Sequence, residues 1–223
     1  MKTNPTQSSI DRQSGKFQVD EQRENILKAA ETLFLHNGLE NASMIDIARQ
    51  AGITRATLYR YFSNRDEIAV QIQIRMMKKI RAVLPDEGQP ATLERHRRRA
   101  QQVIRNFDRL RDAYRYIGMF DRIYLDNDPE SALAQWTKAQ LILGGFGNRG
   151  TGPVPNHPAA WKELGVILST ITWFLEKLAM RGELTWSDPT VSLEEHLKFF
   201  EEMIMRSFDL LEEKKPDGAP SGQ

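Results

Sequence analysis

The run from Ser43 to Phe62 constrains the fold most, because it carries start signals for two short helices and a stop signal between them. Ser43 and Asp46 have the spacing of a capping box, in which each side chain binds the backbone N–H of the other residue. Gly52 can adopt the positive φ with which many helices end. Thr54 is then in place to cap the second helix. The run is therefore predicted to form a helix, a tight turn and a second helix.

The second helix of this pair is predicted to bind DNA. Between Ile47 and Arg65 every charged side chain is an arginine. Guanidinium and hydroxyl donors line the helix, and such groups bind phosphate oxygens and base edges. Arg55 and Arg60 are the candidate base readers, because a guanidinium can bind a guanine edge through paired hydrogen bonds. The net charge of the whole chain is only +1, so the basic surface must be local.

The composition predicts a packed, soluble, cytoplasmic protein. The chain has 223 residues, of which 40% are hydrophobic and 27% are charged. It has no apolar run of about 18 residues, and its polar N-terminus lacks the apolar core of a signal peptide. Cysteine is absent, which excludes disulfides and thiolate metal sites. The histidines lack metal-ligand spacing and no nucleophile motif occurs, so neither an enzyme nor a cofactor or metal site is predicted.

Apolar periodicity predicts an all-α fold of about nine helices in two domains. The core of the first domain is predicted to contain Ile26, Ala30, Phe34, Ile47, Ala48, Leu58 and Phe62. The first helix should run from about Asp20 to Asn37, where Gly38 ends it. The expected organisation is a flexible arm over 1–18, a helix-turn-helix DNA-binding domain over 19–66, a second helical domain that also forms the dimer over 67–213, and a disordered tail over 214–223.

The second domain contains a basic run, Arg95-His96-Arg97-Arg98-Arg99. It lies in the segment 91–125, which is expected to form two helices, or one helix kinked between Asp108 and Asp112. The favoured role for the run is a solvated face with ion pairs to nearby acidic residues. Binding of a ligand carboxylate and contact with DNA are the other two possibilities.

The last helix, predicted from about Ser192 to Leu211, is apolar over more than one face. A surface helix needs an apolar stripe roughly 100° wide, and this helix exceeds it. The excess is expected to be buried against a second copy of the chain. The candidate dimer-interface residues are Trp161, Leu168, Phe174, Leu197, Phe200, Ile204 and Phe208.

The segments that carry a family resemblance are Ile26–Gly38, Ser43–Ala48, Ala51–Thr54, Thr57–Phe62 and Arg65–Ile68. Together they resemble the DNA-binding domain of the TetR family of bacterial transcriptional regulators, over about residues 20–70. The resemblance implies that Ser43 and the N–H groups opening its helix hold a phosphate, and that Arg65 holds the DNA backbone. Ala56 stands where such proteins often have glycine, and it is small enough to permit close approach to DNA. The residues implied to face DNA are Thr54, Arg55, Thr57, Tyr59, Arg60 and Tyr61.

The resemblance further implies a homodimeric regulator, most often a repressor, that binds a pseudo-palindromic operator and is released by a small molecule. The effector pocket would lie in the second domain, although its aromatic residues are individually more often plain core than pocket lining. The polar groups of Tyr and Trp favour an aromatic or amphipathic effector. The alternative function is a helical protein-interaction module whose helix-turn-helix is vestigial and no longer binds DNA. The candidate pocket residues are Phe107, Tyr114, Met119, Phe120, Tyr124, Trp136 and Trp173.

Overall fold

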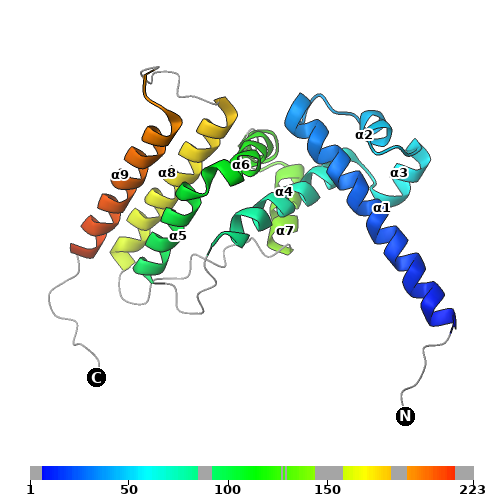
Figure 1. Cartoon of the computed structure of the whole chain (residues 1–223), viewed down its shortest axis with the longest axis horizontal. Coiled ribbons are helices and arrows are strands. Elements are labelled where there is room, and N and C mark those ends of the chain that lie inside the picture. The colour runs from blue at the N-terminus through cyan, green and yellow to red at the C-terminus, as the bar shows by residue number, and fades with distance from the viewer. Residues whose placement is uncertain are drawn as a thin grey trace, which may run out of the picture. The chain divides into compact units, whose positions relative to one another are not determined.

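The computed structural model describes residues 7–84, 92–126, 128, 130–143, 158–181 and 190–213. Within these ranges the chain forms nine α-helices and one π-helical segment and contains no strand (Figure 1), which confirms the all-α fold. The chain divides into two compact units, unit 1 (Met1–Gln73) and unit 2 (Ile74–Gln223). No described helix has the length and apolar character needed to cross a membrane. The elements are α1 (Gln7–Asn37), α2 (Met44–Gln50), α3 (Arg55–Tyr61), α4 (Arg65–Ala82), α5 (Leu93–Arg105), α6 (Phe107–Asp121), η1 (Arg122–Asp126), α7 (Ala132–Leu143), α8 (Pro158–Arg181) and α9 (Leu193–Glu213).

Helix α1 begins at Gln7, well before the predicted start near Asp20. The predicted start is wrong, and residues 7–18, where the composition suggests a flexible arm, belong to this helix. Nothing in this segment obliges a helix to stop: no proline occurs there, and the single Gly15 costs only about 1 kcal/mol relative to alanine. Residues 1–6 and the predicted disordered tail over 214–223 lie outside the described residues.

Unit 1 closes around a small apolar core contributed by α1, α2, α3 and the first part of α4. Ile68 and Ile72 of α4 are fully buried in this core. The prediction succeeds because only one face of each short helix is apolar, so the periodicity leaves a single choice of inward face. The predicted core residues are all confirmed, at 2% exposure or less: Ile26, Ala30, Phe34, Ile47, Ala48, Leu58 and Phe62.

In unit 2, helices α5, α8 and α9 surround a second apolar core, and α6 packs along α8. The segment 91–125 contains two helices, but their junction lies at Asn106 and not between Asp108 and Asp112. The side-chain amide of Asn106 donates to the carbonyl oxygen of Gln102 at 2.8 Å. Asparagine competes in this way with the backbone bonds that would continue a helix, which accounts for the position of the junction.

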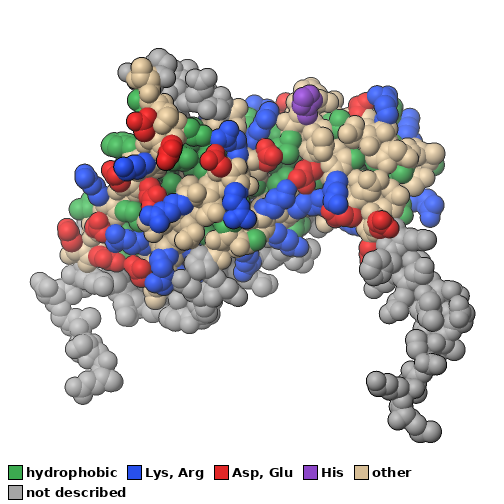
Figure 2. Space-filling model, viewed as in Figure 1, with side chains coloured by type: hydrophobic (Ala, Val, Ile, Leu, Met, Phe, Trp, Pro, Cys, Tyr) green, Lys and Arg blue, Asp and Glu red, His purple; other side chains and the backbone are tan. Residues whose placement is uncertain are grey.

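The basic run of α5 makes ion pairs within unit 2, which confirms the favoured role. Arg97 pairs with Asp209 and Glu212 of α9. His96 is buried, and its Nδ1 lies 2.8 Å from the carbonyl oxygen of Thr92. Figure 2 shows acidic and basic side chains interspersed over the visible face of unit 2, and not a patch of one sign.

The residues predicted for the dimer interface mostly pack inside unit 2. Phe200, Ile204 and Phe208 of α9 are buried and belong to the core. The ring of Phe200 stacks on that of Phe174 in α8, with the ring centroids 3.9 Å apart. The half-buried residues of the set, packed against the same core, are Leu168, Phe174 and Leu197, and the side chain of Trp161 lies outside the described residues.

Other apolar side chains of α8 and α9 are exposed. Phe199, Met203 and Leu210 follow one side of α9 at helical spacing, and 71%, 43% and 59% of their surface is exposed. On α8, Val166 and Trp173 are exposed two turns apart. Periodicity shows how far apolar residues extend around a helix, whereas its tertiary neighbours decide which part packs inward. The α9 side chains line a groove of about 300 Å³ with Glu202, Arg206 and Ser207.

Candidate nucleic-acid interface

Helix α2 begins with the predicted capping box. The N–H of Asp46 donates to Ser43 Oγ at 3.3 Å, and the N–H of Ser43 donates to Asp46 Oδ2 at 3.1 Å. The Ser43 hydroxyl also donates to this carboxylate. These hydrogen bonds hold the pKa of the Asp46 carboxyl below its usual value. Ser43 itself is exposed, so the beginning of α2 is open to solvent.

Ser43→Ala is expected to destabilise the chain by about 1 kcal/mol, because an N–H at the start of α2 loses its acceptor. Urea unfolding followed by circular dichroism measures the change. Ser43→Asn retains an acceptor at the cap and is the matched control. Equal losses in the two variants would contradict the capping role.

Gly52 turns the chain between α2 and α3. Its φ of +68° is one that residues with a side chain rarely adopt. The N–H of Gly52 donates to the carbonyl of Arg49 at 3.1 Å. The N–H of Ile53 donates to the carbonyl of Ala48 at 3.0 Å, which completes a Schellman motif. The Thr54 side chain then caps α3, so the helix, turn and helix are confirmed.

Helix α3 turns Leu58 inward and most of its remaining surface outward. Leu58 is fully buried, and Phe62, directly after the helix, is 1% exposed. Tyr59 is 48% exposed, so its ring lies partly on the protein and partly in solvent. Among the residues predicted to face DNA, Thr54, Arg55, Ala56, Tyr59 and Arg60 are exposed, and Thr57 and Tyr61 are half-buried.

Arg65, the predicted backbone contact, has interactions within unit 1. Its Nη1 donates to the carbonyl oxygen of Glu40 at 3.3 Å, and its Nη2 lies 3.7 Å from the Asp66 carboxylate. One third of its side chain, 33%, remains exposed. Arg65 therefore joins the start of α4 to the connection between α1 and α2, and any DNA contact would add to this structural role.

Two contacts attach α1 to the helix-turn-helix. The guanidinium carbon of Arg23 lies 4.4 Å from the ring centroid of Phe62, a cation–π geometry. Asn25 Nδ2 donates to the carbonyl oxygen of Ala51 at 3.0 Å. These contacts hold α1 beside the end of α2 and the end of α3.

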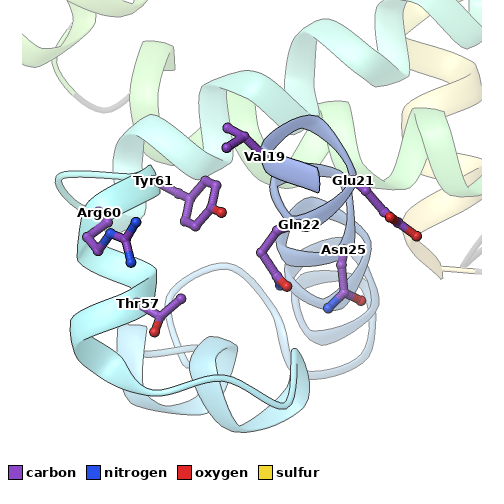
Figure 3. Close-up of a pocket in the computed structure, with 7 residues that line it drawn as sticks. All are labelled: Val19, Glu21, Gln22, Asn25, Thr57, Arg60 and Tyr61. Atoms are coloured by element: carbon purple, nitrogen blue, oxygen red, sulfur yellow. The ribbon is translucent and has the colours of Figure 1, made fainter. Parts of the chain in front are cut away.

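A groove of about 590 Å³ opens between α1 and α3 (Figure 3). In Figure 3, Gln22 and the Tyr61 ring lie on opposite sides of the groove, whereas the Glu21 carboxylate points away from it. The sequence does not predict the α1 side of the groove, because nothing in the spacing of the polar residues of α1 indicates that they face α3. The lining residues are Val19, Glu21, Gln22 and Asn25 of α1 and Thr57, Arg60 and Tyr61 of α3.

The candidate pocket residues of unit 2 divide into buried and exposed groups. The tryptophans, Trp136 and Trp173, are 38% and 56% exposed. The rings of Phe120 and Tyr124 lie together, with centroids 4.6 Å apart. The buried residues of the set, at 6% exposure or less, are Phe107, Tyr114, Met119, Phe120 and Tyr124.

Carboxyl groups of α6, η1 and α8 lie close enough in unit 2 to repel one another. Burial raises the pKa of Asp121 to about 7, and the charge of Asp126 adds to this shift. Burial also raises the pKa of Glu176 to about 7, with Asp121 and Asp126 adding to it. Helices α6 and α8 approach closely at Gly118, where a Cβ would lie 3.4 Å from Glu176 Cβ.

Asp121→Asn is expected to raise the free energy of unfolding by about 1–2 kcal/mol more at pH 8 than at pH 5. Between its ordinary pKa and about 7, Asp121 is protonated in the folded chain and ionised in the unfolded chain. The stability of the unmodified chain therefore falls as pH rises through this window, whereas an amide does not titrate. Urea unfolding across the window measures the slope. The exposed Glu130→Gln is the control, and an unaltered slope in Asp121→Asn would contradict the assignment.

Residues 26–72 match the family described as bacterial regulatory proteins, tetR family. An HTH-type transcriptional regulator of Haemophilus influenzae is 34% identical over 70 residues, which cover 30% of this chain and 37% of that protein. TtgR of Pseudomonas putida is 38% identical over 53 residues, 24% of this chain and 25% of TtgR. The repressor BepR of Brucella suis is 40% identical over 53 residues, with the same coverage of 24% and 25%. The chain thus aligns with well under half of each relative, and all three are named as regulators and not as enzymes.

Several solved structures have a fold similar to that of this chain over most of its length. The flavonoid-responsive regulator FrrA has a TM-score of 0.57 at 21% identity, covering 89% of this chain and 100% of FrrA. A TetR family regulator from Marinobacter aquaeolei has a TM-score of 0.55 at 18% identity, covering 86% of this chain and 97% of that one. At sequence identities this low, the similarity to these structures shows the fold and nothing more. The capped helix-turn-helix lies inside the matched segment 26–72, so this segment resembles the tetR family of bacterial regulatory proteins in both sequence and local structure.

Proposed function

We propose that the chain is a transcriptional repressor that binds a pseudo-palindromic operator as a homodimer and is released from it by a small molecule. The outer face of α3 carries this proposal, because Arg55 and Arg60 are exposed on either side of Ala56 with no acid in the helix. Each guanidinium can bind a guanine edge, and a small residue between them lets the helix approach the bases closely. Ser43 and the N–H groups that open α2 would hold a phosphate, for which the Ser43 hydroxyl would have to leave the Asp46 carboxylate.

A homodimer is proposed because α8 and α9 expose apolar side chains in the single chain. The exposed apolar residues are Phe199, Met203 and Leu210 on α9 and Val166 and Trp173 on α8. Large apolar patches of this kind mark interaction sites, and a twofold pair would cover the same face on both copies. The two α3 helices would then meet successive major grooves about 34–36 Å apart, or at a multiple of that distance.

The effector is proposed to bind in unit 2 near Tyr114, Phe120 and Tyr124. These rings combine apolar surface with hydroxyl groups, which suits an aromatic or amphipathic molecule. The effector would favour a dimer geometry in which the α3 helices have the wrong separation for the operator. It can weaken DNA binding only by the difference between its affinities for the two geometries. The designation of BepR as a repressor supports repression over activation.

Selection from a pool of random duplexes by the full chain tests DNA recognition. The expected result is enrichment of an inverted repeat that binds two chains per duplex. A pool from which no sequence is enriched would contradict the proposal and favour the helical interaction module. Release is tested by titrating small aromatic and amphipathic molecules into the selected complex. A molecule that saturates unit 2 without weakening operator binding would contradict the release mechanism.

A further inference from the structure

The groove between α1 and α3 contains a hydrogen-bond donor that the packing of unit 1 does not use. Gln22 Nε2 is buried and has no acceptor among the residues that the structure describes. Folded proteins rarely keep such a donor unsatisfied, because it has lost its water without gaining a partner. The Gln22 side chain lines the groove, so a rotation of its amide would present this donor to a molecule that enters the groove.

The groups around Gln22 include one cation and several hydrogen-bond donors. Neither the guanidinium of Arg60 nor the hydroxyl of Tyr61 has a hydrogen bond or ion pair within the described part of the chain. Glu21 is the acid in the lining, and Figure 3 shows its carboxylate directed away from the groove. An amide N–H, a phenol and a nearby cation thus face one space, and a phosphate oxygen can accept from several such donors at once.

The position of the groove on α3 identifies the source of the phosphate. Thr57 and Tyr61 are one turn apart on the flank of α3 that faces α1, whereas Ala56 and Tyr59 lie on the exposed surface. Arg60 belongs to both, since it is exposed and also lines the groove. When a recognition helix enters the major groove, its flanks meet the phosphates that border that groove.

We propose that the α1–α3 groove is a seat for one backbone phosphate of the operator. The amide of Gln22 and the hydroxyl of Tyr61 donate to its oxygens, and Arg60 supplies positive charge at the mouth of the groove. This inference rests on the proposed function, and it adds α1 to the DNA-contact surface. A phosphate contact positions the protein without reading sequence, so Gln22 acts on every duplex alike.

Gln22→Met tests the seat, because methionine keeps the length of the side chain and removes the donor. Binding of the full-length variant to the selected duplex and to a scrambled duplex is expected to weaken by about tenfold in both cases. Gln22→Glu places a carboxylate in the seat and should weaken binding further, by about a hundredfold at low salt, with the additional loss shrinking as salt is raised. The control is Gln50→Met, at an exposed glutamine of α2 outside the groove, which should bind as the unmodified chain does. Thermal unfolding of each variant shows that the fold is retained.

Phosphate ethylation interference locates the contact. Among the phosphates whose ethylation weakens binding of the unmodified chain, one per half-site should have much less effect on Gln22→Met, which already lacks that contact. Unchanged affinity of both Gln22 variants would contradict the phosphate seat. A loss of affinity confined to the selected duplex would also contradict it, because Gln22 would then contact a base. Stabilisation by inorganic phosphate that depends on Gln22, with unchanged duplex affinities, would assign the groove to free phosphate instead. Failure of the unmodified chain to bind any duplex would contradict the proposed function itself, which keeps the two failures distinct.

Discussion

A monomer is the expected product of combining Phe199→Glu with Leu210→Glu, and operator affinity is expected to fall by about a hundredfold or more. Both side chains are mostly exposed in the single chain, at 71% and 59%, so the changes leave the core of unit 2 intact. In a twofold pair the introduced carboxylates would be brought together in a desolvated interface. Each chain would then hold only one half of the operator. Light scattering measures the mass, and fluorescence anisotropy measures the affinity for the duplex.

Leu133→Glu provides the matched control for this loss of dimer. It makes the same exchange at another exposed apolar residue, on α7, where 41% of the leucine is exposed. The control variant should keep the mass of a dimer and the affinity of the unmodified chain. A dimer mass for the double α9 variant would place the interface on another face of the protein.

Arg60→Ala is expected to weaken binding to the selected duplex by about 1–3 kcal/mol, which is roughly ten- to hundredfold. Arg60 is exposed on α3 and makes no ion pair within the described ranges, so its loss removes a DNA contact without disturbing the core of unit 1. Anisotropy titrations with the selected and the scrambled duplex measure the difference. The loss should be much larger on the selected sequence if the guanidinium reads a base.

The control for Arg60 is Arg81→Ala, which removes the same charge from the exposed last turn of α4. It should change both affinities only slightly, because it lies outside the helix-turn-helix. Equal losses on the selected and scrambled duplexes for Arg60→Ala would show that Arg60 holds a phosphate and reads no base.

The helix-turn-helix could be predicted because its signals are local. Ser43 and Asp46, then Gly52 and Thr54, each act within a few residues, and the hydrogen bonds that they form are those that their spacing predicts. The start of α1 could not be predicted in the same way. Residues 7–18 contain only two large apolar residues, Ile10 and Phe17, so the sequence gives no periodic apolar pattern there.

The features that depend on tertiary packing could not be predicted from the sequence. Both Phe199 and Phe200 of α9 are large and apolar, yet one is exposed and the other is buried beside Phe174. Neighbouring helices decide between them, and the sequence of α9 alone does not contain that information. The same holds for Gln22, which is one polar residue among many until α3 is seen to lie opposite it.

A hydroxyl-radical footprint of the full chain on a selected duplex tests most directly whether α3 reads DNA as one half of a twofold pair. The predicted result is two protected patches related by twofold symmetry, about one helical turn apart or a multiple of it, with two chains bound per duplex. Arg60→Ala should lose both patches at the same protein concentration. A single patch from one chain, or uniform protection along every duplex, would contradict a paired, sequence-reading α3.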